Sequence, residues 1–238
     1  MTFTQLVNAI LAPSKRQLIK VHSNIVYEHD WVMDARRRLA DKKEGVIIDI
    51  GANCGQTTKR LARAFPSFDI HCLEPNAELH EKIRERAGFH KNLTIHRLGA
   101  GLRDEELAFH KSSKHESNSF RKDWSHRHGT PVAEEIVPVC RLDTFCTKHH
   151  IDTISVLKTN AEGFDYQILE GAAPLLAQKK ILCLIVEVSF GSLGEESARP
   201  GSFLNLMEGH GYQFLGLYET ARNKTTGGIK WGNMLFAA

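Results

Sequence analysis

The chain has 238 residues, of which 42% are hydrophobic and 25% are charged, and its formal net charge is +3. This length and composition fit one globular α/β domain with room for a short N-terminal addition. The small charge argues against a nucleic-acid partner, and the absence of eighteen consecutive apolar residues argues against a membrane span. We therefore expect a cytoplasmic protein.

The cysteines and the N-terminal residues agree with this expectation. The five cysteines are odd in number and irregularly spaced, so they predict no disulfide framework. Apolar residues from Phe3 to Leu11 recur at helical spacing, and polar Gln5 and Asn8 interrupt any leader-like apolar run. We expect residues 1–44 to form a helical extension that packs on a domain formed by residues 45–238.

From residue 46 onward the pattern alternates between strands and helices, which is typical of a mostly parallel sheet. The first three strands are predicted at residues 46–50, 70–73 and 93–98. Between them, one helix is expected at residues 56–65. A second helix would begin after Asn76, a favourable N-cap, and end at Gly88.

The second half of the chain is less regular. Residues 110–130 are polar and predict a loop beside a short strand at residues 107–110. Further strands are expected at residues 136–139, 154–157, 182–188, 214–218 and 231–236. Helices are expected at 142–149, around 168–176 with a restart at Pro174, and after Ser202 as N-cap. The glycine-containing link at 225–228 suits a hairpin, so the last two strands should be antiparallel.

The turn after the first strand is the most informative segment, with the sequence DIGANCGQTT at residues 49–58. It lies where open α/β sheets bind ligands, outside the carboxyl end of a strand. Gly51 and Gly55 can adopt backbone angles that other residues avoid. The dinucleotide fingerprint fails because Asn53 and Gln56 stand where it needs glycine, and no Lys-Ser or Lys-Thr pair completes a phosphate loop.

The neighbouring residues favour S-adenosylmethionine as the ligand. Asp49 suits a ligand that carries a sulfonium and an ammonium better than it suits a pyrophosphate. Glu74, at the tip of the second strand, can accept hydrogen bonds from a ribose diol. Small residues at 99–101 leave room for a flat adenine. A purely structural turn is the alternative for the glycine loop taken alone.

With these motifs the chain resembles the FkbM family of S-adenosylmethionine-dependent methyltransferases. The matching segments are DIGANCGQTT at 49–58, LEPNAEL at 73–79, LKTNAEGFDYQILEGA at 157–172 and LIVEVSF at 184–190. The resemblance implies a Rossmann-like class I methyltransferase fold: a seven-stranded, mostly parallel sheet with its last strand antiparallel and helices on both faces. It also implies O-methylation of a hydroxyl on a sugar, glycan or natural product.

The resemblance further implies cofactor contacts from the tips of three strands. Carried over by position, these are Asp49, Gly51, Ala52, Asn53, Gly55, Gln56, Thr57, Glu74, Pro75, Asn76, Gly99 and Ala100. One residue departs from the family pattern, which usually has aspartate where this chain has Asn160. An amide cannot act as a carboxylate base, although it can still form hydrogen bonds.

The tip of the fourth strand would face the transferred methyl group. Lys158, Asn160 and Glu162 lie there and are the candidate catalytic residues. A hydroxyl acceptor must lose a proton, so a base within reach assists the transfer. Glu162 is the leading base, and its alternative role is a charge at a helix N-terminus. Glu187, in the apolar fifth strand, either shapes the acceptor site or pairs with a cation.

Two other clusters invite competing interpretations. The segment 110–128 is either a solvated loop or a lid that binds an anionic acceptor through Lys111, Lys114, Arg121, Lys122 or Arg127. The spacing of Cys140, Cys146, His149 and His150 matches no standard zinc site, so no metal is expected.

Four functions stay open from the sequence, and one of them, a nucleic-acid methyltransferase, would need more basic surface than the net charge of +3 suggests, although the segment 110–128 could serve locally. The other three are as follows. The first is an S-adenosylmethionine-dependent methyltransferase acting on a small-molecule or glycan acceptor, anionic ones included. The second is a methyltransferase-like protein that binds the cofactor without turnover, as Asn160 suggests. The third is a nicotinamide-dependent oxidoreductase, which the missing glycines oppose. The sequence does not indicate the oligomeric state.

Overall fold

A computed structural model describes residues 30–190 and 199–238 of the chain, without the side chains of residues 126–128. The amphipathic helix expected between Phe3 and Leu11 lies outside the described residues. The described end of the N-terminal region forms helix α2 (Trp31–Arg38), and Trp31, Val32 and Ala35 are buried against the core. The Tyr218 hydroxyl donates a hydrogen bond to Asp34 Oδ2 at 3.0 Å, which ties this helix to the C-terminal part of the chain.

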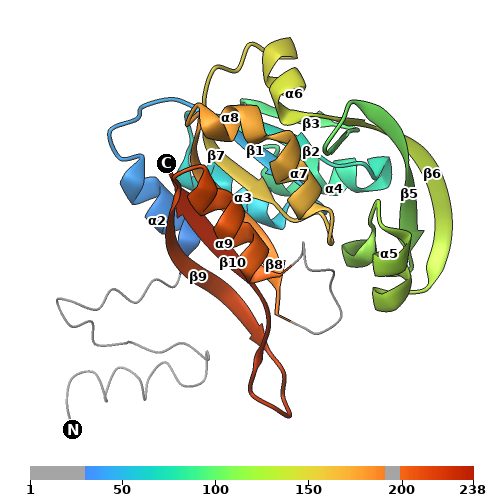
Figure 1. Cartoon of the computed structure of the whole chain (residues 1–238). Helices are drawn as coiled ribbons and strands as arrows, with labels where there is room; N and C mark the ends of the chain where they lie inside the picture. The colour runs from blue at the N-terminus through green and yellow to red at the C-terminus, as the bar shows by residue number, and fades with distance from the viewer. Residues whose placement is uncertain (1–29, 191–198) are drawn as a thin grey trace, which may run out of the picture.

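The framework is a seven-stranded sheet with the order β3-β2-β1-β7-β8-β10-β9 (Figure 1). Its strands are β1 (Val46–Ile50), β2 (Asp69–Leu73), β3 (Leu93–His96), β7 (Ile154–Thr159), β8 (Ile181–Ser189), β9 (Gln213–Arg222) and β10 (Ile229–Ala237). The first five strands pair in parallel, while β10 runs antiparallel to both β8 and β9. The predicted fold class and the predicted C-terminal hairpin are therefore confirmed.

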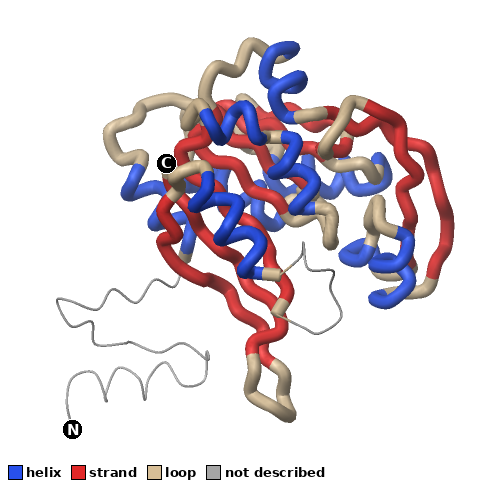
Figure 2. Tube along the Cα trace, viewed as in Figure 1, coloured by secondary structure: helices blue, strands red, loops and turns tan. Residues whose placement is uncertain are grey.

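Helices cover both faces of this sheet (Figure 2). One face carries α3 (Gln56–Ala64), α4 (His80–Ala87, preceded by the 3₁₀ turn Ala77–Leu79) and α2; the other carries α6 (Leu142–Lys148), α7 (Asp165–Gly171), α8 (Ala173–Ala177) and α9 (Pro200–Gly209). Alternation along β1 explains the two layers, because Ile47 packs into one core and Ile48 and Ile50 into the other. A strand buried on both faces reads as a continuous apolar run.

Residues 99–140 form a unit that we call the insertion. It contains β4 (Gly99–Ala100), β5 (Glu105–Ser112), the 3₁₀ turn His115–Ser117, α5 (Lys122–His128) and β6 (Pro131–Cys140). The three strands make a second sheet, ordered β4-β6-β5, which lies to the right of the main sheet in Figure 1. The loop predicted at 110–130 was therefore wrong for most of that segment. Only residues 110–112 of this segment belong to the sheet, and the 3₁₀ turn and α5 account for most of its other ordered residues.

One helix boundary also differs from the expectation. Helix α9 begins at Pro200 with Arg199 as its N-cap, and Ser202 lies inside its first turn. Proline is favoured at the first helical position because its backbone angle is preset and its missing N–H would have no helical partner there. The proline therefore determines the start, and the prediction of Ser202 as the cap was wrong.

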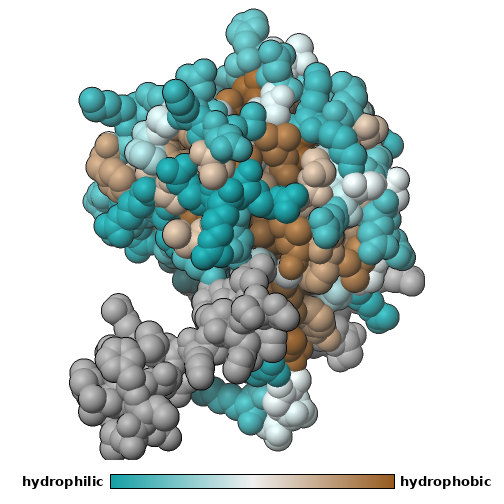
Figure 3. All heavy atoms as spheres, turned by 90° about the vertical axis from the view of Figure 1, so that its left-hand side faces the viewer, coloured by the Kyte–Doolittle hydropathy of each residue, from teal (hydrophilic) through white to brown (hydrophobic). Residues whose placement is uncertain are grey.

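The surface is mixed in character. The face shown in Figure 3 is mostly hydrophilic, with a band of apolar side chains running down its middle. Exposed large apolar side chains of the described residues include Met33, Phe214 and Trp231. Within residues 30–190 and 199–238, no helix has the length and apolar character required to cross a bilayer.

Helix α7 packs so closely on the insertion that one glycine should be essential there. A Cβ on Gly171 would lie 2.1 Å from the backbone oxygen of Gly101. Because backbone cannot yield as a side chain can, we expect Gly171→Ala to lower the free energy of unfolding by about 1–3 kcal/mol. Gly201→Ala in α9 is the matched control, since a Cβ there meets nothing within 4 Å. Urea unfolding measures both, and an equal effect of the two changes would contradict the packing described here.

Candidate active site

The loop between β1 and α3 is a tight turn that its glycines make possible. Gly51 has φ +68°, and a Cβ there would lie 1.9 Å from the backbone oxygen of Asn160. Gly55 has φ +78° and packs against Ile83 of α4. Glycine is thus required at 51 because the β7 tip crosses directly over the loop. The unusual backbone angle predicted for this glycine is confirmed, and the crossing β7 tip is a second reason for it.

Glu74 holds two loops together at the carboxyl ends of β1 and β2. Its carboxylate accepts hydrogen bonds from the backbone N–H of Asn53, at 2.7 Å, and of Asn76, at 2.9 Å. The side chain is only 5% exposed, and burial raises its pKa although the two backbone donors oppose that shift. Each carboxylate oxygen keeps a further lone pair for a ligand.

Asp49 and Lys158 form an ion pair beneath the loop. Lys158 Nζ lies 2.9 Å from Asp49 Oδ1 and donates hydrogen bonds to the carbonyl oxygens of Ile50, at 3.0 Å, and Gly51, at 2.8 Å. The Thr58 hydroxyl donates to Asp49 Oδ2 at 2.7 Å. The carboxylate is fully buried, and its Oδ1 receives no hydrogen bond from the described residues, so its contact with the ammonium is an ion pair. This geometry gives Asp49 and Lys158 a structural role, while the cofactor contact of Asp49 and the catalytic role of Lys158 stay predictions.

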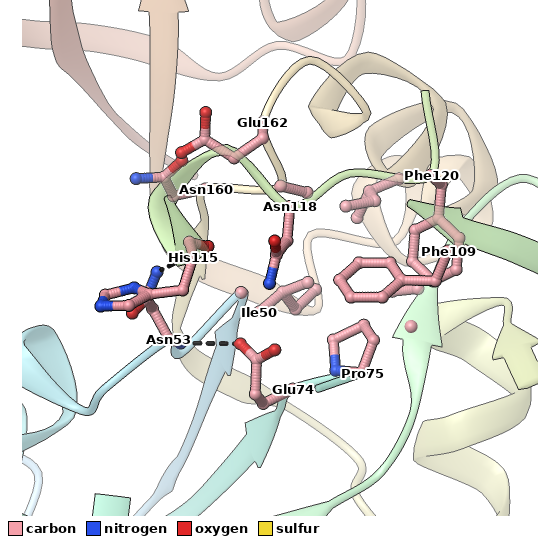
Figure 4. Close-up of a pocket in the computed structure, with 15 residues that line it drawn as sticks. Ile50, Asn53, Glu74, Pro75, Phe109, His115, Asn118, Phe120, Asn160 and Glu162 are labelled. Atoms are coloured by element: carbon pink, nitrogen blue, oxygen red, sulfur yellow. Dashed lines mark hydrogen bonds between the residues drawn. The ribbon is translucent and has the colours of Figure 1, made fainter. Parts of the chain in front are cut away.

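An inner cavity opens between these strand tips and the insertion (Figure 4). Its floor comes from β1 and β2, with Asn53, Glu74 and Pro75 among the residues. Small Gly99 and Ala100 form one side. The insertion supplies the opposite wall through Phe109, His115, Asn118 and Phe120. The space is thus lined by aromatic rings and small residues as well as by polar side chains.

A larger outer cavity of about 660 Å³ adjoins the inner one. Aromatic side chains from four separate segments line it, namely Trp124, Tyr166, Phe203 and Trp231. The residues common to both cavities are Gly51, Asn53, Asn160 and Glu162. The two spaces therefore meet at the carboxyl end of β7.

Two half-buried carboxylates, Glu162 and Glu187, line the outer cavity near this junction. Burial and the charge of Glu187 raise the pKa of Glu162, whose side chain accepts a hydrogen bond from Trp124 Nε1 at 3.1 Å. Burial and the charge of Asp165 raise the pKa of Glu187, which accepts a hydrogen bond from Asn160 Nδ2 at 3.1 Å. Two adjacent carboxylates in a low dielectric retain a proton more readily than isolated ones. The arrangement can therefore exchange a proton near neutral pH.

The other predicted site residues divide between these spaces. Ala52, Gln56 and Thr57 line the outer cavity, while Pro75, Gly99 and Ala100 line the inner one. Two lie at neither cavity: Gly55 packs against α4, and Asn76 caps the 3₁₀ turn by accepting a hydrogen bond from the Glu78 N–H at 3.2 Å.

Sequence reasoning missed the residues that other segments bring to the site. His115 and Asn118 lie in the region read as a loop, Phe109 lies in the short strand predicted beside it, and Tyr166 and Trp231 looked like ordinary helix and strand residues. The two isolated aromatic residues of segment 110–128, Phe120 and Trp124, were the available signal, because aromatic side chains in a polar stretch usually pack on something.

The basic residues of the insertion are arranged differently from the anion-binding lid considered above. Lys111 pairs with Glu78 at 3.1 Å and with Glu135, and Arg121 pairs with Asp123 at 2.9 Å. Two of the expected anion ligands are therefore engaged with carboxylates of the chain itself. The side chain of Arg127 is not among those described.

The thiols and imidazoles form no metal site in the described part of the chain. All five cysteines are free, and burial raises the pKa of Cys140 to about 12 and of Cys146 to about 11. No cluster of three or more potential ligands was found among residues 30–190 and 199–238. His71, His96 and His149 instead stack around Phe145.

Comparison with known proteins agrees with this geometry. The FkbM methyltransferase domain matches residues 49–214. The 2-O-methyltransferase NoeI of Sinorhizobium fredii (strain NBRC 101917 / NGR234) is 23% identical over 178 residues, covering 69% of this chain and 68% of NoeI.

Solved structures also resemble the chain. A precorrin-6y C5,15-methyltransferase from Geobacter metallireducens GS-15 has a TM-score of 0.48 at 12% identity, covering 92% of this chain and 93% of that one. An rRNA methylase from Streptococcus thermophilus has a TM-score of 0.47 at 12% identity, covering 90% and 98%. The fold assignment rests on the strand order described above.

The strand order, the antiparallel β10 and the site at the carboxyl ends of β1, β2 and β7 define a class I methyltransferase. Because the domain match extends over more than half of its length, the chain belongs to the FkbM methyltransferase family. It is thus an enzyme of a family whose methyl donor is S-adenosylmethionine.

The ion pair beneath the loop should dominate the stability of the site. Lys158→Met leaves Asp49 buried without its cation, so we expect the free energy of unfolding to fall by about 3–5 kcal/mol. The double variant Lys158→Met/Asp49→Asn should be less unstable than Lys158→Met, because it removes the unpaired charge. The control is Glu81→Gln, which breaks the exposed Arg84 pair at 3.1 Å and should cost about 1 kcal/mol or less. Thermal and urea unfolding would refute this account if the double variant were the least stable.

Proposed function

We propose that this protein transfers the methyl group of S-adenosylmethionine to a hydroxyl oxygen of a small molecule, a sugar or a glycan. The observation that carries the proposal is the junction of the two cavities at Glu162, where the small inner cavity meets a larger space beside a pair of carboxylates. Donor and acceptor would meet there.

The inner cavity fits the methyl donor chemically. Glu74 offers carboxylate lone pairs to ribose hydroxyls, and Ala100 and the ring of Phe120 line the part of the cavity where the adenine would lie. Two buried polar atoms at this cavity, Asn160 Oδ1 and His115 Nδ1, have no hydrogen-bond partner among the described residues. A ligand carrying an ammonium and hydroxyl groups would satisfy such atoms. Residues 51–53 and 74–75 would hold the donor, with Gly99 and Ala100 beside the adenine.

Glu162 is suited to accept the acceptor's proton. When bound, S-adenosylmethionine supplies a methyl carbon activated by a sulfonium, so the acceptor oxygen forms the new bond while the carbon–sulfur bond breaks. The hydroxyl proton passes to the Glu162 carboxylate, which Trp124 orients. Asn160 holds Glu187 beside it, and the raised pKa makes the carboxylate a stronger base than an exposed glutamate.

The outer cavity supports an acceptor with both apolar and polar faces. Rings such as Tyr166 and Trp231 offer flat apolar surfaces, while Asn223 and Lys230 offer polar contacts. Sugars and related natural products present both kinds of surface. No ion pair of Lys230 is recorded within the described residues, so it is the candidate partner for an anionic group on the acceptor. The activity named for NoeI, transfer to oxygen, also supports a hydroxyl acceptor.

Production of S-adenosylhomocysteine tests the proposal. The protein is incubated with S-adenosylmethionine and a panel of hydroxyl compounds: neutral sugars, uronic acids, sugar phosphates, oligosaccharides and phenols, with structured RNA and a thiol as comparison. We expect product with at least one hydroxyl small molecule and none with RNA. Turnover with RNA alone would overturn the proposed acceptor class.

Glu162→Gln, assayed with the accepted compound, separates proton transfer from binding. We expect kcat to fall about 100-fold with little change in donor affinity, because general-base assistance contributes factors of that order. Since the base acts only when ionised and its pKa is raised, the wild-type kcat should increase as pH rises through the neutral range. The variant should lose this increase. A wild-type pH dependence retained by Glu162→Gln would exclude Glu162 as the base.

A further inference from the structure

The insertion places the polar side chain of Asn118 in the inner cavity, where the proposed reaction gives it no role. Asn118 lies directly after the 3₁₀ turn His115–Ser117, is 9% exposed and lines the cavity. Figure 4 shows its amide pointing into the space between Glu74 and Phe109, with the nitrogen turned toward the middle of the cavity. No partner of this nitrogen is recorded among the described residues.

The orientation of this amide is determined by the chain itself. The backbone N–H of Ser112, at the end of β5, donates a hydrogen bond to Asn118 Oδ1 at 2.8 Å. Because an N–H group can only donate, the atom that faces it must be the amide oxygen. The amide nitrogen, with its two protons, is therefore directed away from β5 and into the cavity. Inverting the amide would place two donors against each other.

The insertion is also fixed relative to the catalytic loop. The Ser119 hydroxyl donates to the backbone oxygen of Glu162 at 2.8 Å, and Gly99 leaves room for the ring of Phe120, which a Cβ at 99 would meet at 2.5 Å. Asn118 directly precedes these two contacts along the chain, and its own Oδ1 is bound by the Ser112 N–H of β5. Its position is therefore held by β5 and by the contacts of the two residues that follow it, as recognition of a ligand requires.

We propose that Asn118 is a binding residue for the nucleoside half of the methyl donor, an inference that rests on the proposed function. It donates a hydrogen bond to an acceptor atom of the adenosine group, opposite the Glu74 carboxylate, which accepts from the ribose hydroxyls. The Asn118 amide donates from one wall and the Glu74 carboxylate accepts on the other. A nucleoside carries both hydrogen-bond acceptors and donors, so it can bind to both walls. The insertion thus completes the donor site, and its role is distinct from the acceptor lid considered from the sequence.

Asn118→Asp is the decisive variant because it changes one property at this position. An aspartate keeps the shape and still accepts the Ser112 hydrogen bond, yet it replaces the inward donor with an acceptor. Asn118→Ala removes both groups without adding charge. Asn92→Asp is the matched control, since Asn92 is exposed and precedes β3, at the amino ends of the strands and away from the carboxyl ends that form the site.

Calorimetric titration with two ligands measures the effect. S-adenosylhomocysteine contains both halves of the donor, and 5′-methylthioadenosine lacks the amino-acid half. We expect Asn118→Asp to weaken both ligands by about the same factor, tenfold or more, with the melting temperature close to that of the wild type. Asn118→Ala should weaken both ligands equally, and Asn92→Asp should change neither.

The outcomes separate this inference from the proposed function. If the wild type binds neither ligand, the proposed function fails. If the wild type binds and both Asn118 variants retain its affinity, Asn118 only closes its own loop and the inference is wrong. A loss confined to S-adenosylhomocysteine would place Asn118 at the amino-acid half and would also overturn the inference. Comparison of the two ligands within each folded variant keeps the test valid if one variant is unstable.

Discussion

The site depends on the contacts of the Lys158 ammonium group. This group reaches from β7 beneath the glycine loop, neutralises the fully buried Asp49 and binds the carbonyl oxygens of Ile50 and Gly51. A buried carboxylate without this partner would be strongly unfavourable, so the pair fixes where β1 ends and how the loop turns. Gly51 then lets the β7 tip pass over the loop, which brings Asn160 and Glu162 above the inner cavity.

The insertion gives this common fold its particular site. Its sheet covers the inner cavity. Trp124 donates a hydrogen bond to the Glu162 carboxylate, and Ser119 donates one to the Glu162 backbone oxygen. The same short segment therefore contacts the proposed nucleoside site and positions the proposed base. Asn160 also stabilises the carboxylate pair. Its amide donates a hydrogen bond to Glu187, whereas an aspartate at position 160 would repel the Glu187 carboxylate.

The sequence predicted the main sheet well because buried parallel strands are apolar throughout and end in recognisable turns. The strand tips bearing Glu74 and Glu162 could be placed for the same reason. The insertion could not, because its strands are polar on their solvent side and its order depends on contacts with distant residues. The pairing of Asp49 with Lys158 was also unpredictable from spacing, since it joins residues more than a hundred positions apart across neighbouring strands.

A crystal structure with S-adenosylhomocysteine bound would test the central claim most directly, that the donor and acceptor spaces meet at Glu162. We predict the adenosine group in the inner cavity between Glu74 and Asn118, with the sulfur beside the Glu162 and Glu187 carboxylates and facing the outer cavity. A sulfur atom directed away from the carboxylate pair, or a nucleoside bound in the outer cavity, would contradict the account.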